Sequence, residues 1–317
     1  MVRNNAPVSG DFPKVTLVVP AYNHADYVEE CLESIIIQDY PALELIIIND
    51  GSSDATGERI EEFIASHKQA AASGGPRFNY ISKKNEGLLR SLNMAIGMAT
   101  GKYLCELASD DLLLPGSISA RVSFMESRPE LDLAFADCLI MNGSEKTEDR
   151  LIKRKADEKA GYDSKTHTVV DFINRDARIF FPTGIFKVEA LKRFGGFDED
   201  FRFCEDTFMR YKMALETVVG YNDSPVMYYR LHGTNVSRGN PLKLMPEKIL
   251  ALEKLLPLVS DDKVRSLIKE KLFKYNLKYF RLGKAEGLGR DKLKGALDSA
   301  LECKPSSLKV RYMRMKI

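Results

Sequence analysis

The order of apolar and polar positions in the first 140 residues follows two different periods. Four short runs are mostly apolar and predict strands, and the first two are typical of strands buried on both faces of a sheet. They lie at residues 15–19, 43–48, 78–82 and 103–107. The segments between them carry apolar residues every three or four positions, which predicts helices. They lie at residues 26–38, where Asp26 is the expected N-cap, and at 54–66 and 85–99. Strands and helices in alternation predict a doubly wound, mostly parallel α/β sheet.

The second half of the chain is patterned differently. Further strand-like pieces lie at residues 133–141, 183–187 and 226–230. Residues 142–167 are polar and charged, and we expect a long surface excursion there, as in lids and binding loops. Leucine and phenylalanine recur at helical spacing over residues 243–303. We therefore expect an α/β domain over residues 1–240 and a helical C-terminal extension over residues 241–317.

The charge is distributed unevenly along the chain. The formal net charge is only +2, which argues against a dedicated nucleic-acid-binding protein. However, residues 1–262 carry 31 Lys and Arg against 40 Asp and Glu, whereas residues 263–317 carry 16 against 5. A basic end on an acidic body suggests that the end meets a negatively charged partner.

Other compositional features narrow the class of protein. The five cysteines are scattered, with no CxxC pair, so we expect reduced thiols, no zinc site and a cytoplasmic protein. The first 14 residues lack the apolar core of a signal peptide. Apolar runs are far shorter than the roughly 20 residues that span a bilayer. We expect a protein that is not integral to a membrane.

Polar side chains follow each of the first four predicted strands. The segments are Pro20-Ala21-Tyr22-Asn23, Asn49-Asp50-Gly51-Ser52-Ser53-Asp54, Lys83-Lys84-Asn85-Glu86-Gly87 and Ala108-Ser109-Asp110-Asp111. The carboxyl ends of parallel strands meet at one edge, where open α/β sheets bind ligands. There an aromatic ring can stack on a base, and carboxylates can accept from N–H or hydroxyl groups. Neither GxGxxG nor GxxxxGK[ST] is present.

The adjacent carboxylates of Asp110 and Asp111 have two interpretations. Mg²⁺ and Mn²⁺ are commonly held by one or two carboxylates together with substrate phosphates. Alternatively, Ser109-Asp110-Asp111 is an acidic turn that caps a helix starting near Pro115. Taken alone, such a triplet is more often a cap than a metal site.

The order of these segments resembles family 2 of the inverting, nucleotide-sugar-dependent glycosyltransferases, which have the GT-A fold. The resemblance covers roughly residues 14–240 and rests on several short motifs in sequence order. They are Val18-Val19-Pro20-Ala21-Tyr22-Asn23, Ile48-Asn49-Asp50-Gly51-Ser52-Ser53-Asp54, Asn85-Glu86-Gly87 with Asn93, Ser109-Asp110-Asp111, Phe197-Asp198-Glu199 with Glu205-Asp206, and Tyr229-Arg230-Leu231-His232 with Asn235 and Ser237. Each motif is weak alone, and the ordered set is specific.

The resemblance implies roles for individual positions. Asp206 would be the general base, with Glu205 beside it on the acceptor side. Asp110 would be the main ligand of Mn²⁺ or Mg²⁺, and His232 would approach the metal or the diphosphate. The remaining positions would bind the nucleotide sugar, with Asp50 accepting a hydrogen bond from a base N–H. They are Pro20, Ala21, Tyr22, Asn23, Asp50, Lys84, Asn85, Gly87, Ser109, Asp110 and Asp111. No partner is evident for His24, His67 or His167, which we expect at the surface.

Two positions depart from the family pattern. Ala108 stands where many relatives have the first Asp of an Asp-x-Asp motif. Leu92 stands where the helix often carries an Arg before Asn93, so a phosphate contact would be lost or moved to Lys83 or Lys84.

The resemblance implies transfer of a sugar from a nucleotide-diphosphate donor, such as a UDP sugar, to a glycan hydroxyl. The expected acceptor is a lipid-linked intermediate of a surface polysaccharide, and the sequence identifies neither the sugar nor the linkage. Three alternatives stay open: a non-catalytic nucleotide-sugar-binding relative, a polyprenyl-phosphate glycosyltransferase and a nucleotidyltransferase. The basic end, where Lys309, Arg311 and Arg314 alternate with apolar residues, is either a solvated helical face or a peripheral contact with anionic lipid at the inner membrane face.

Overall fold

The computed structural model describes residues 12–67, 76–151, 168–174, 179–233 and 240–317. The chain forms two compact units that each draw on separate stretches of sequence. Unit 1 comprises Met1–Ser164, Ile179–Gly195 and Asn222–Arg230, and unit 2 comprises Lys165–Arg178, Gly196–Tyr221 and Leu231–Ile317. In this division Gly196–Tyr221 groups with the C-terminal helices, and the expected boundary at residue 240 stays a prediction.

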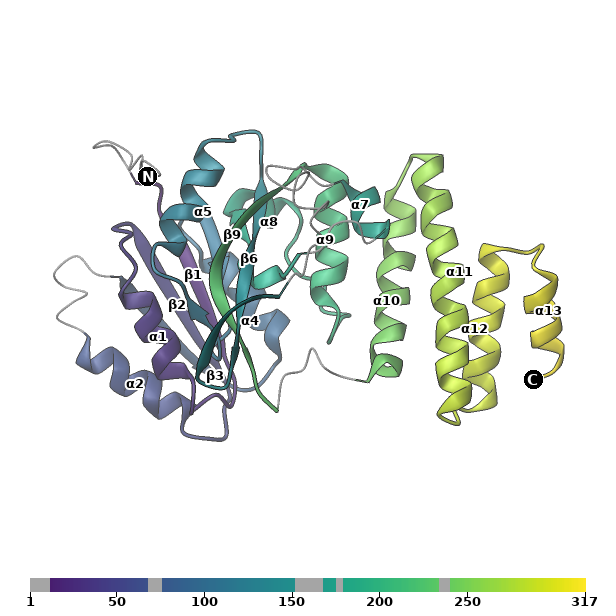
Figure 1. Cartoon of the computed structure of the whole chain (residues 1–317), viewed down its shortest axis with the longest axis horizontal. Coiled ribbons are helices and arrows are strands. Elements are labelled where there is room, and N and C mark those ends of the chain that lie inside the picture. The colour runs from purple at the N-terminus through teal and green to yellow at the C-terminus, as the bar shows by residue number, and fades with distance from the viewer. Residues whose placement is uncertain (1–11, 68–75, 152–167, 175–178, 234–239) are drawn as a thin grey trace. The chain divides into compact units, whose positions relative to one another are not determined.

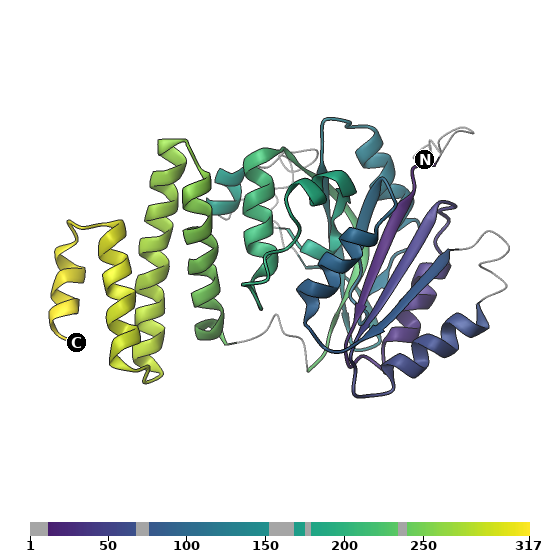
Figure 2. The ribbon, with the colours of Figure 1, turned by 180° about the vertical axis from the view of Figure 1, so that it is seen from behind.

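Unit 1 begins with four strands that match the four apolar runs. They are β1 (Val15–Ala21), β2 (Leu43–Asp50), β3 (Arg77–Lys83) and β4 (Tyr103–Glu106). All are parallel, and β1 lies between β2 and β4. The connecting helices are α1 (Val28–Ile36), α2 (Thr56–Ser66) and α4 (Leu88–Met98). Figures 1 and 2 show α1 and α2 on one face of this sheet and α4 on the other, as expected for a doubly wound arrangement.

The sheet continues past β4 with antiparallel strands. Its order is β3-β2-β1-β4-β8-β6-β9-β5, with β7 paired to β6. The added strands are β5 (Leu112–Leu113), β6 (Leu133–Asn142), β7 (Glu145–Arg150), β8 (Ile185–Lys187) and β9 (Val219–Leu231). Helices α5 (Ser117–Glu126) and α8 (Val188–Arg193) and the short 3₁₀ turn η1 (Phe181–Thr183) connect them. The expected mostly parallel α/β sheet is thus confirmed, with an antiparallel half that the sequence pattern did not reveal.

Strands β1, β2 and β4 are buried because both of their faces are covered, whereas β3 is partly exposed. Val15, Leu17, Val19, Leu45 and Ile47 have no exposed surface. They belong to one apolar cluster with the inward side chains of α1 and α5. This core positions the carboxyl ends of β1, β2 and β4, where the loops of the candidate site begin.

Unit 2 is helical. Its elements are α7 (Val169–Asn174), α9 (Glu205–Glu216), α10 (Pro241–Leu255), the 3₁₀ turn η3 (Leu256–Leu258), α11 (Asp262–Ala285), α12 (Arg290–Cys303) and α13 (Leu308–Met315). Helices α10, α11, α12 and α13 pack side by side in chain order (Figure 1). Within the described ranges, no helix is both long and apolar enough to cross a bilayer.

Two local expectations were wrong, and one alternative interpretation is excluded. Asp26 does not cap α1, whose N-cap is Tyr27 with no side-chain cap hydrogen bond. Residues 142–150 form the turn and second strand of a hairpin with β6 instead of an open excursion, while residues 152–167 lie outside the described residues. The acidic triplet does not cap a helix, because α5 starts at Ser117 after Gly116 and β5 intervenes. Alternating polar residues in β7 carried no apolar signal, so the hairpin was missed.

Candidate functional site

The carboxyl ends of β1 and β4 form the switch point of the parallel sheet, because the chain winds away from this pair in opposite directions. Open α/β sheets bind ligands in the crevice outside such a point. The segment 20–24 begins at the end of β1 and continues past it, and the segment 107–111 follows β4. Leu107 donates its backbone N–H to the Val18 carbonyl at 2.9 Å, which keeps the two segments adjacent. Two of the four motif segments therefore meet at this point.

The loops after β1 and β2 are tied together by reciprocal hydrogen bonds. The Asn23 backbone N–H donates to Ser52 Oγ at 3.0 Å, and Asn23 Oδ1 accepts from the Ser53 backbone N–H at 2.8 Å. Asn23 has φ of 54°, a left-handed conformation that asparagine tolerates better than most residues. Ala25 donates to Asp54 Oδ2 at 3.1 Å, adding another link between the loops. Asn23 is therefore a structural organiser of this rim, and its side-chain oxygen is already used.

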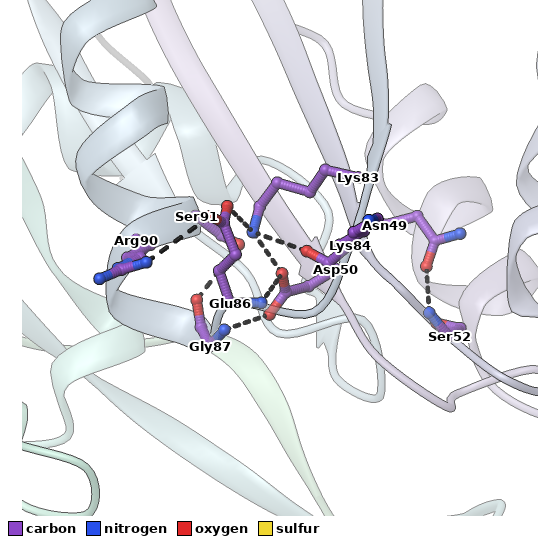
Figure 3. Close-up of polar contacts among 9 residues, drawn as sticks. All are labelled: Asn49, Asp50, Ser52, Lys83, Lys84, Glu86, Gly87, Arg90 and Ser91. Carbon is purple, nitrogen blue, oxygen red and sulfur yellow. Dashed lines mark hydrogen bonds and ion pairs between the residues drawn. The ribbon is translucent and has the colours of Figure 1, made fainter.

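Asp50, at the end of β2, organises the loop after β3 (Figure 3). Its two carboxylate oxygens accept hydrogen bonds from the backbone N–H groups of Glu86 at 3.0 Å and Gly87 at 2.8 Å. Lys83 donates to the same carboxylate. Burial alone would raise the pKa of Asp50, but these donors outweigh it and hold the pKa below its usual value. The carboxylate that the sequence assigned to a base N–H is thus engaged in holding the loop 83–87.

The loop after β2 approaches the loop after β3 so closely that only glycine fits between them. Gly51 has φ of 69°. A Cβ atom there would lie 2.5 Å from the Asn85 backbone nitrogen and 3.1 Å from the Lys83 carbonyl oxygen. Because backbone atoms cannot move aside as a flexible side chain does, this contact fixes how the Asn85 segment sits on the rim.

Arg230, on β9, anchors the acidic turn after β4. Its backbone N–H donates to Asp111 Oδ1 at 2.9 Å, and its guanidinium donates to the Asp110 carbonyl at 2.7 Å. The same guanidinium reaches the Gly143 carbonyl and the Glu30 carboxylate, each at 2.6 Å. Only 2% of Arg230 is exposed. The sequence motif included Arg230 without a role, and its position within a motif was the only available signal.

The two adjacent aspartates differ in their surroundings. Asp111 is almost fully buried, and burial raises the pKa of its carboxyl group well above the usual range. The charge of Asp110 raises it further, and the hydrogen bond from Arg230 offsets only part of the effect. Asp110 keeps about 12% of its side chain exposed. Asp110 is therefore the carboxylate of this pair that can reach a ligand, while Asp111 holds the turn.

His24 lies at the site, which corrects its expected place as an unpartnered surface residue. Its Nδ1 is 2.8 Å from Ser109 Oγ, and its Nε2 is 3.7 Å from Asp110 Oδ2. About a quarter of the side chain is exposed. His67, by contrast, stacks on Phe63 within α2, and His167 lies outside the described residues. Sequence patterns did not reveal this position of His24, because Ser109 and Asp110 lie 85 and 86 positions away.

Several other predicted donor-binding residues are accessible at the same rim. Tyr22 is 47% exposed, so it is not a core aromatic. Lys84 and Asn85 are exposed, and Pro20 and Gly87 are partly exposed, whereas Ala21 and Ser109 are buried. Lys83 is paired with Asp50 and Glu86, which leaves Lys84 as the accessible cation of that loop. Leu92 stands in the position expected for an Arg. It is 4% exposed and lies on the buried face of α4.

The residues at the rim fit a divalent cation that is shared with a ligand. No group of three or more His, Cys, Asp or Glu in the described part of the chain is arranged as a metal cage. Mg²⁺ is usually bound by one or two carboxylates together with substrate phosphates and water, so a cage is not required. Asp110 provides one accessible carboxylate of this kind. His232 belongs to unit 2.

The second group of predicted residues lies in unit 2, at the start of α9. Glu205 and Asp206 form the first turn of this helix, where acids interact favourably with the helix dipole. Asp206 is 37% exposed and has Arg210 Nη1 at 3.8 Å from Oδ2. Glu205 Oε2 is buried, with no hydrogen-bond partner among the described residues. Burial, with the neighbouring charge of Asp206, raises the pKa of Glu205 to about 7.

Helix α10 holds the segment that leads into these acids. Glu247 Oε2 accepts three backbone N–H groups in succession, from Arg202 at 3.1 Å, Phe203 at 2.7 Å and Cys204 at 2.8 Å. About two turns further along α10, Lys254 Nζ pairs with Asp198 Oδ2 at 2.6 Å. The motif 197–206 is therefore attached at two points to a helix that the sequence assigned to a separate extension. Neither Glu247 nor Lys254 belongs to a recognised motif, so sequence reasoning had no signal for them.

Comparison with known proteins gives a consistent result. The family model described as glycosyl transferase family 2 matches residues 16–185. An uncharacterized glycosyltransferase of Haemophilus influenzae is 38% identical over 120 residues, which are 38% of this chain and 35% of that protein. The chain thus spans about a third of that relative's length.

Two solved structures share the fold at low sequence identity. Staphylococcus aureus TarS 1–349 in complex with UDP-GlcNAc has a TM-score of 0.67 and 17% identity, covering 95% of this chain and 84% of that one. A mannosyltransferase from Pyrobaculum calidifontis in complex with GDP-Man and Mn²⁺ has a TM-score of 0.59 and 19% identity, covering 99% of this chain and 81% of that one. Both likenesses concern the fold.

Proposed function

The chain belongs to glycosyl transferase family 2 and has the GT-A fold, and from that premise we propose that it moves one sugar from a nucleoside-diphosphate donor to a hydroxyl of a glycan acceptor. We propose a UDP sugar as the donor and a lipid-linked polysaccharide intermediate as the acceptor. The observation that carries the proposal is that the loops after β1, β2, β3 and β4 lie along one edge of the sheet and are linked by hydrogen bonds. Accessible aromatic, amide, cationic and carboxylate groups meet there.

The donor is bound by the rim of unit 1. Tyr22, with Pro20 and Ala21 before it, offers an exposed ring for a base. Lys84 and the segment of Asn85 and Gly87 lie under the ribose and diphosphate. Support comes from α4, which starts at Leu88 after Gly87 with no side-chain cap, since an uncapped helix N-terminus favours phosphate. Asn23 and Asp50 act by holding these loops in register. Ser109 supports the acidic turn through His24.

The leaving diphosphate is stabilised at Asp110. A bound Mn²⁺ or Mg²⁺ supplies positive charge against the negative charge that develops on the departing diphosphate. Asp110 would hold that ion together with the donor phosphates, and His232 would approach the ion or the diphosphate. Asp111 and Arg230 keep the turn in shape, as their hydrogen bond indicates. The absence of a carboxylate at position 108 leaves Asp110 as the single accessible acid of this turn.

The acceptor hydroxyl loses its proton to Asp206. A carboxylate within hydrogen-bond reach of the hydroxyl acts as general base during the attack. Asp206 is the more accessible acid of the pair, whereas the Glu205 carboxylate is buried. Glu205 lies beside Asp206 on the acceptor side. A single displacement with a single base inverts the anomeric centre. No enzyme nucleophile takes part in this scheme.

A lipid-linked acceptor would be held in a membrane, so the protein would act at a membrane surface. We propose that the basic end of the chain meets an anionic membrane that carries the lipid-linked acceptor. Support comes from the excess of basic over acidic residues in residues 263–317. Basic residues next to a membrane are attracted to anionic lipid headgroups.

Thermal-shift measurements and transfer assays with a panel of nucleotide sugars, with and without Mn²⁺, test the proposal. We expect UDP with Mn²⁺ to stabilise the wild-type protein and Asp110→Ala to lose most of that stabilisation. Asp206→Asn should abolish transfer and keep nucleotide binding. Asp291→Asn, which changes an acid in the first turn of α12, is the matched control and should transfer normally.

Each outcome identifies a different error. Wild-type transfer by Asp206→Asn would show that another group is the base. Binding of a donor without transfer to any acceptor tested would favour the non-catalytic relative. Stabilisation by no nucleoside diphosphate, with or without Mn²⁺, would refute the assignment of the donor site.

A further inference from the structure

Helix α13 has an apolar stripe that faces away from the protein. Leu308 and Met315 are each 77% exposed, and Tyr312 is 53% exposed. These positions are four and three residues apart, so their side chains lie along one face of the helix. They are large apolar side chains at high exposure, close together on a single short element.

The opposite face of α13 is attached to unit 2. Val310 is fully buried in an apolar cluster with Phe280 of α11 and Leu297 of α12. Arg314 pairs with Asp298 of α12, with the Nη2–Oδ2 distance at 3.3 Å. The orientation of the helix is therefore determined by packing, and the exposed stripe is not explained by loose attachment.

Basic side chains flank the exposed stripe on both sides. At 100° per residue, Arg311 lies on one side of the stripe, and Lys309 and Lys316 lie on the other. All three are exposed, and Lys316 Nζ lies 4.5 Å above the Tyr312 ring. Residues 303–317 contain no acid. An apolar face bordered by cations is the pattern of a helix that lies in the headgroup region of an anionic bilayer.

We propose that α13 is the membrane-contacting element of this protein, with Leu308, Tyr312 and Met315 inserted among lipid headgroups and Lys309, Arg311 and Lys316 against anionic phosphates. A second copy of the chain fits this surface poorly. A two-fold contact through the stripe would bring the three cations of each copy together, and like charges in contact repel. An anionic lipid surface satisfies the apolar and the cationic side chains at once. The inference deepens the proposed membrane contact and names the residues that make it.

Flotation of the full chain with vesicles tests the inference. We expect binding to phosphatidylcholine–phosphatidylglycerol vesicles, weak binding to phosphatidylcholine alone, and loss of binding between about 0.1 M and 1 M salt as the charges are screened. Leu308→Ser with Met315→Ser should weaken binding by at least about tenfold, since two large apolar side chains no longer enter the bilayer. Lys309→Glu with Arg311→Glu should weaken it by roughly thirtyfold or more.

Matched controls separate the stripe from general effects. Leu258→Ser removes an apolar side chain that is 54% exposed on η3, and Lys263→Glu with Lys278→Glu makes the same change in net charge on α11. Both controls should bind vesicles like the wild type. All substituted side chains are exposed, so we expect unfolding temperatures close to the wild-type value for every variant.

Three results would overturn the inference. They are no flotation of the wild type, flotation of the stripe variant at the wild-type level, and a concentration-dependent dimer that the stripe variant abolishes in the absence of vesicle binding. Donor hydrolysis, measured on the same variants without lipid, should be unchanged. Vesicle binding by a protein without glycosyl transfer would leave α13 as a membrane contact and refute only the proposed function.

Discussion

Gly51→Ala is the sharpest test of how the donor-binding rim is built. Gly51 adopts φ of 69°, and left-handed backbone costs a residue with a Cβ roughly 1–2 kcal/mol. The added methyl would also lie 2.5 Å from the Asn85 nitrogen, so the loops after β2 and β3 must separate. Overpacking of this kind typically costs about 1–3 kcal/mol more. We expect Gly51→Ala to lower the free energy of unfolding by the sum of both effects.

Gly116→Ala is a matched control for the cost of placing a residue with a Cβ atom in the left-handed conformation. Gly116 has φ of 71°, nearly the same conformation, and a Cβ there meets no described atom within 4 Å. Gly116→Ala should therefore lose only about 1–2 kcal/mol. The difference between the two variants isolates the contact between the two loops.

Urea denaturation of both variants measures this difference, and calorimetric titration with UDP and Mn²⁺ measures its effect on the site. Because the displaced loop carries Lys84, Asn85 and Gly87, Gly51→Ala should weaken nucleotide binding by about tenfold or more, equivalent to roughly 1.4 kcal/mol. Gly116→Ala should bind nucleotide normally. Equal losses of stability in the two variants, or normal binding by Gly51→Ala, would refute the reasoning about this contact.

The remaining predictions concern the acidic turn and the α9 acids. Arg230→Lys keeps the charge but not the planar fork that bonds several partners at once, so calorimetry should find UDP binding weaker with Mn²⁺ and nearly unchanged without it. Glu247→Ala removes the acceptor of three N–H groups next to Glu205 and Asp206, and steady-state assays should find a lower kcat at an unchanged donor KM, partly restored in Glu247→Gln. A lower kcat together with a raised donor KM would indicate a general disturbance of the structure instead. The raised pKa of Glu205, about 7 against an ordinary 4.5, means that the folded state holds this proton more tightly than the unfolded state. The resulting stability is complete below about pH 4.5 and is lost by up to about 3 kcal/mol as the pH rises through 7. Glu205→Gln cannot ionise, so its advantage in denaturation free energy over the wild type should grow between pH 5 and 8, and a constant difference would contradict the buried environment.

The first half of the sheet was predictable because its signals are local. Strands β1 and β2 are apolar on both faces, and α1, α2 and α4 repeat apolar positions at helical spacing. Each motif segment also lies at the end of a predicted strand. Because the carboxyl ends of parallel strands lie at one edge of a sheet, this alone predicts that Tyr22, Asp50 and Asp110 share that edge. The antiparallel half was less visible, since β7 is a polar hairpin strand and β8 has only three residues.

The chain's residues by themselves determined the family, the parallel core and the edge of the sheet where the motif segments meet. These follow from short-range patterns of hydrophobicity and from the order of motifs along the chain. Tertiary structure decided how individual groups are used. Asp50 is engaged by a loop 36 positions away, His24 lies against Ser109 across 85 positions, and Arg230 anchors a turn 120 positions before it. Hydrogen bonds and burial depend on distances in space, and no spacing along a sequence encodes which distant strand end lies beside another.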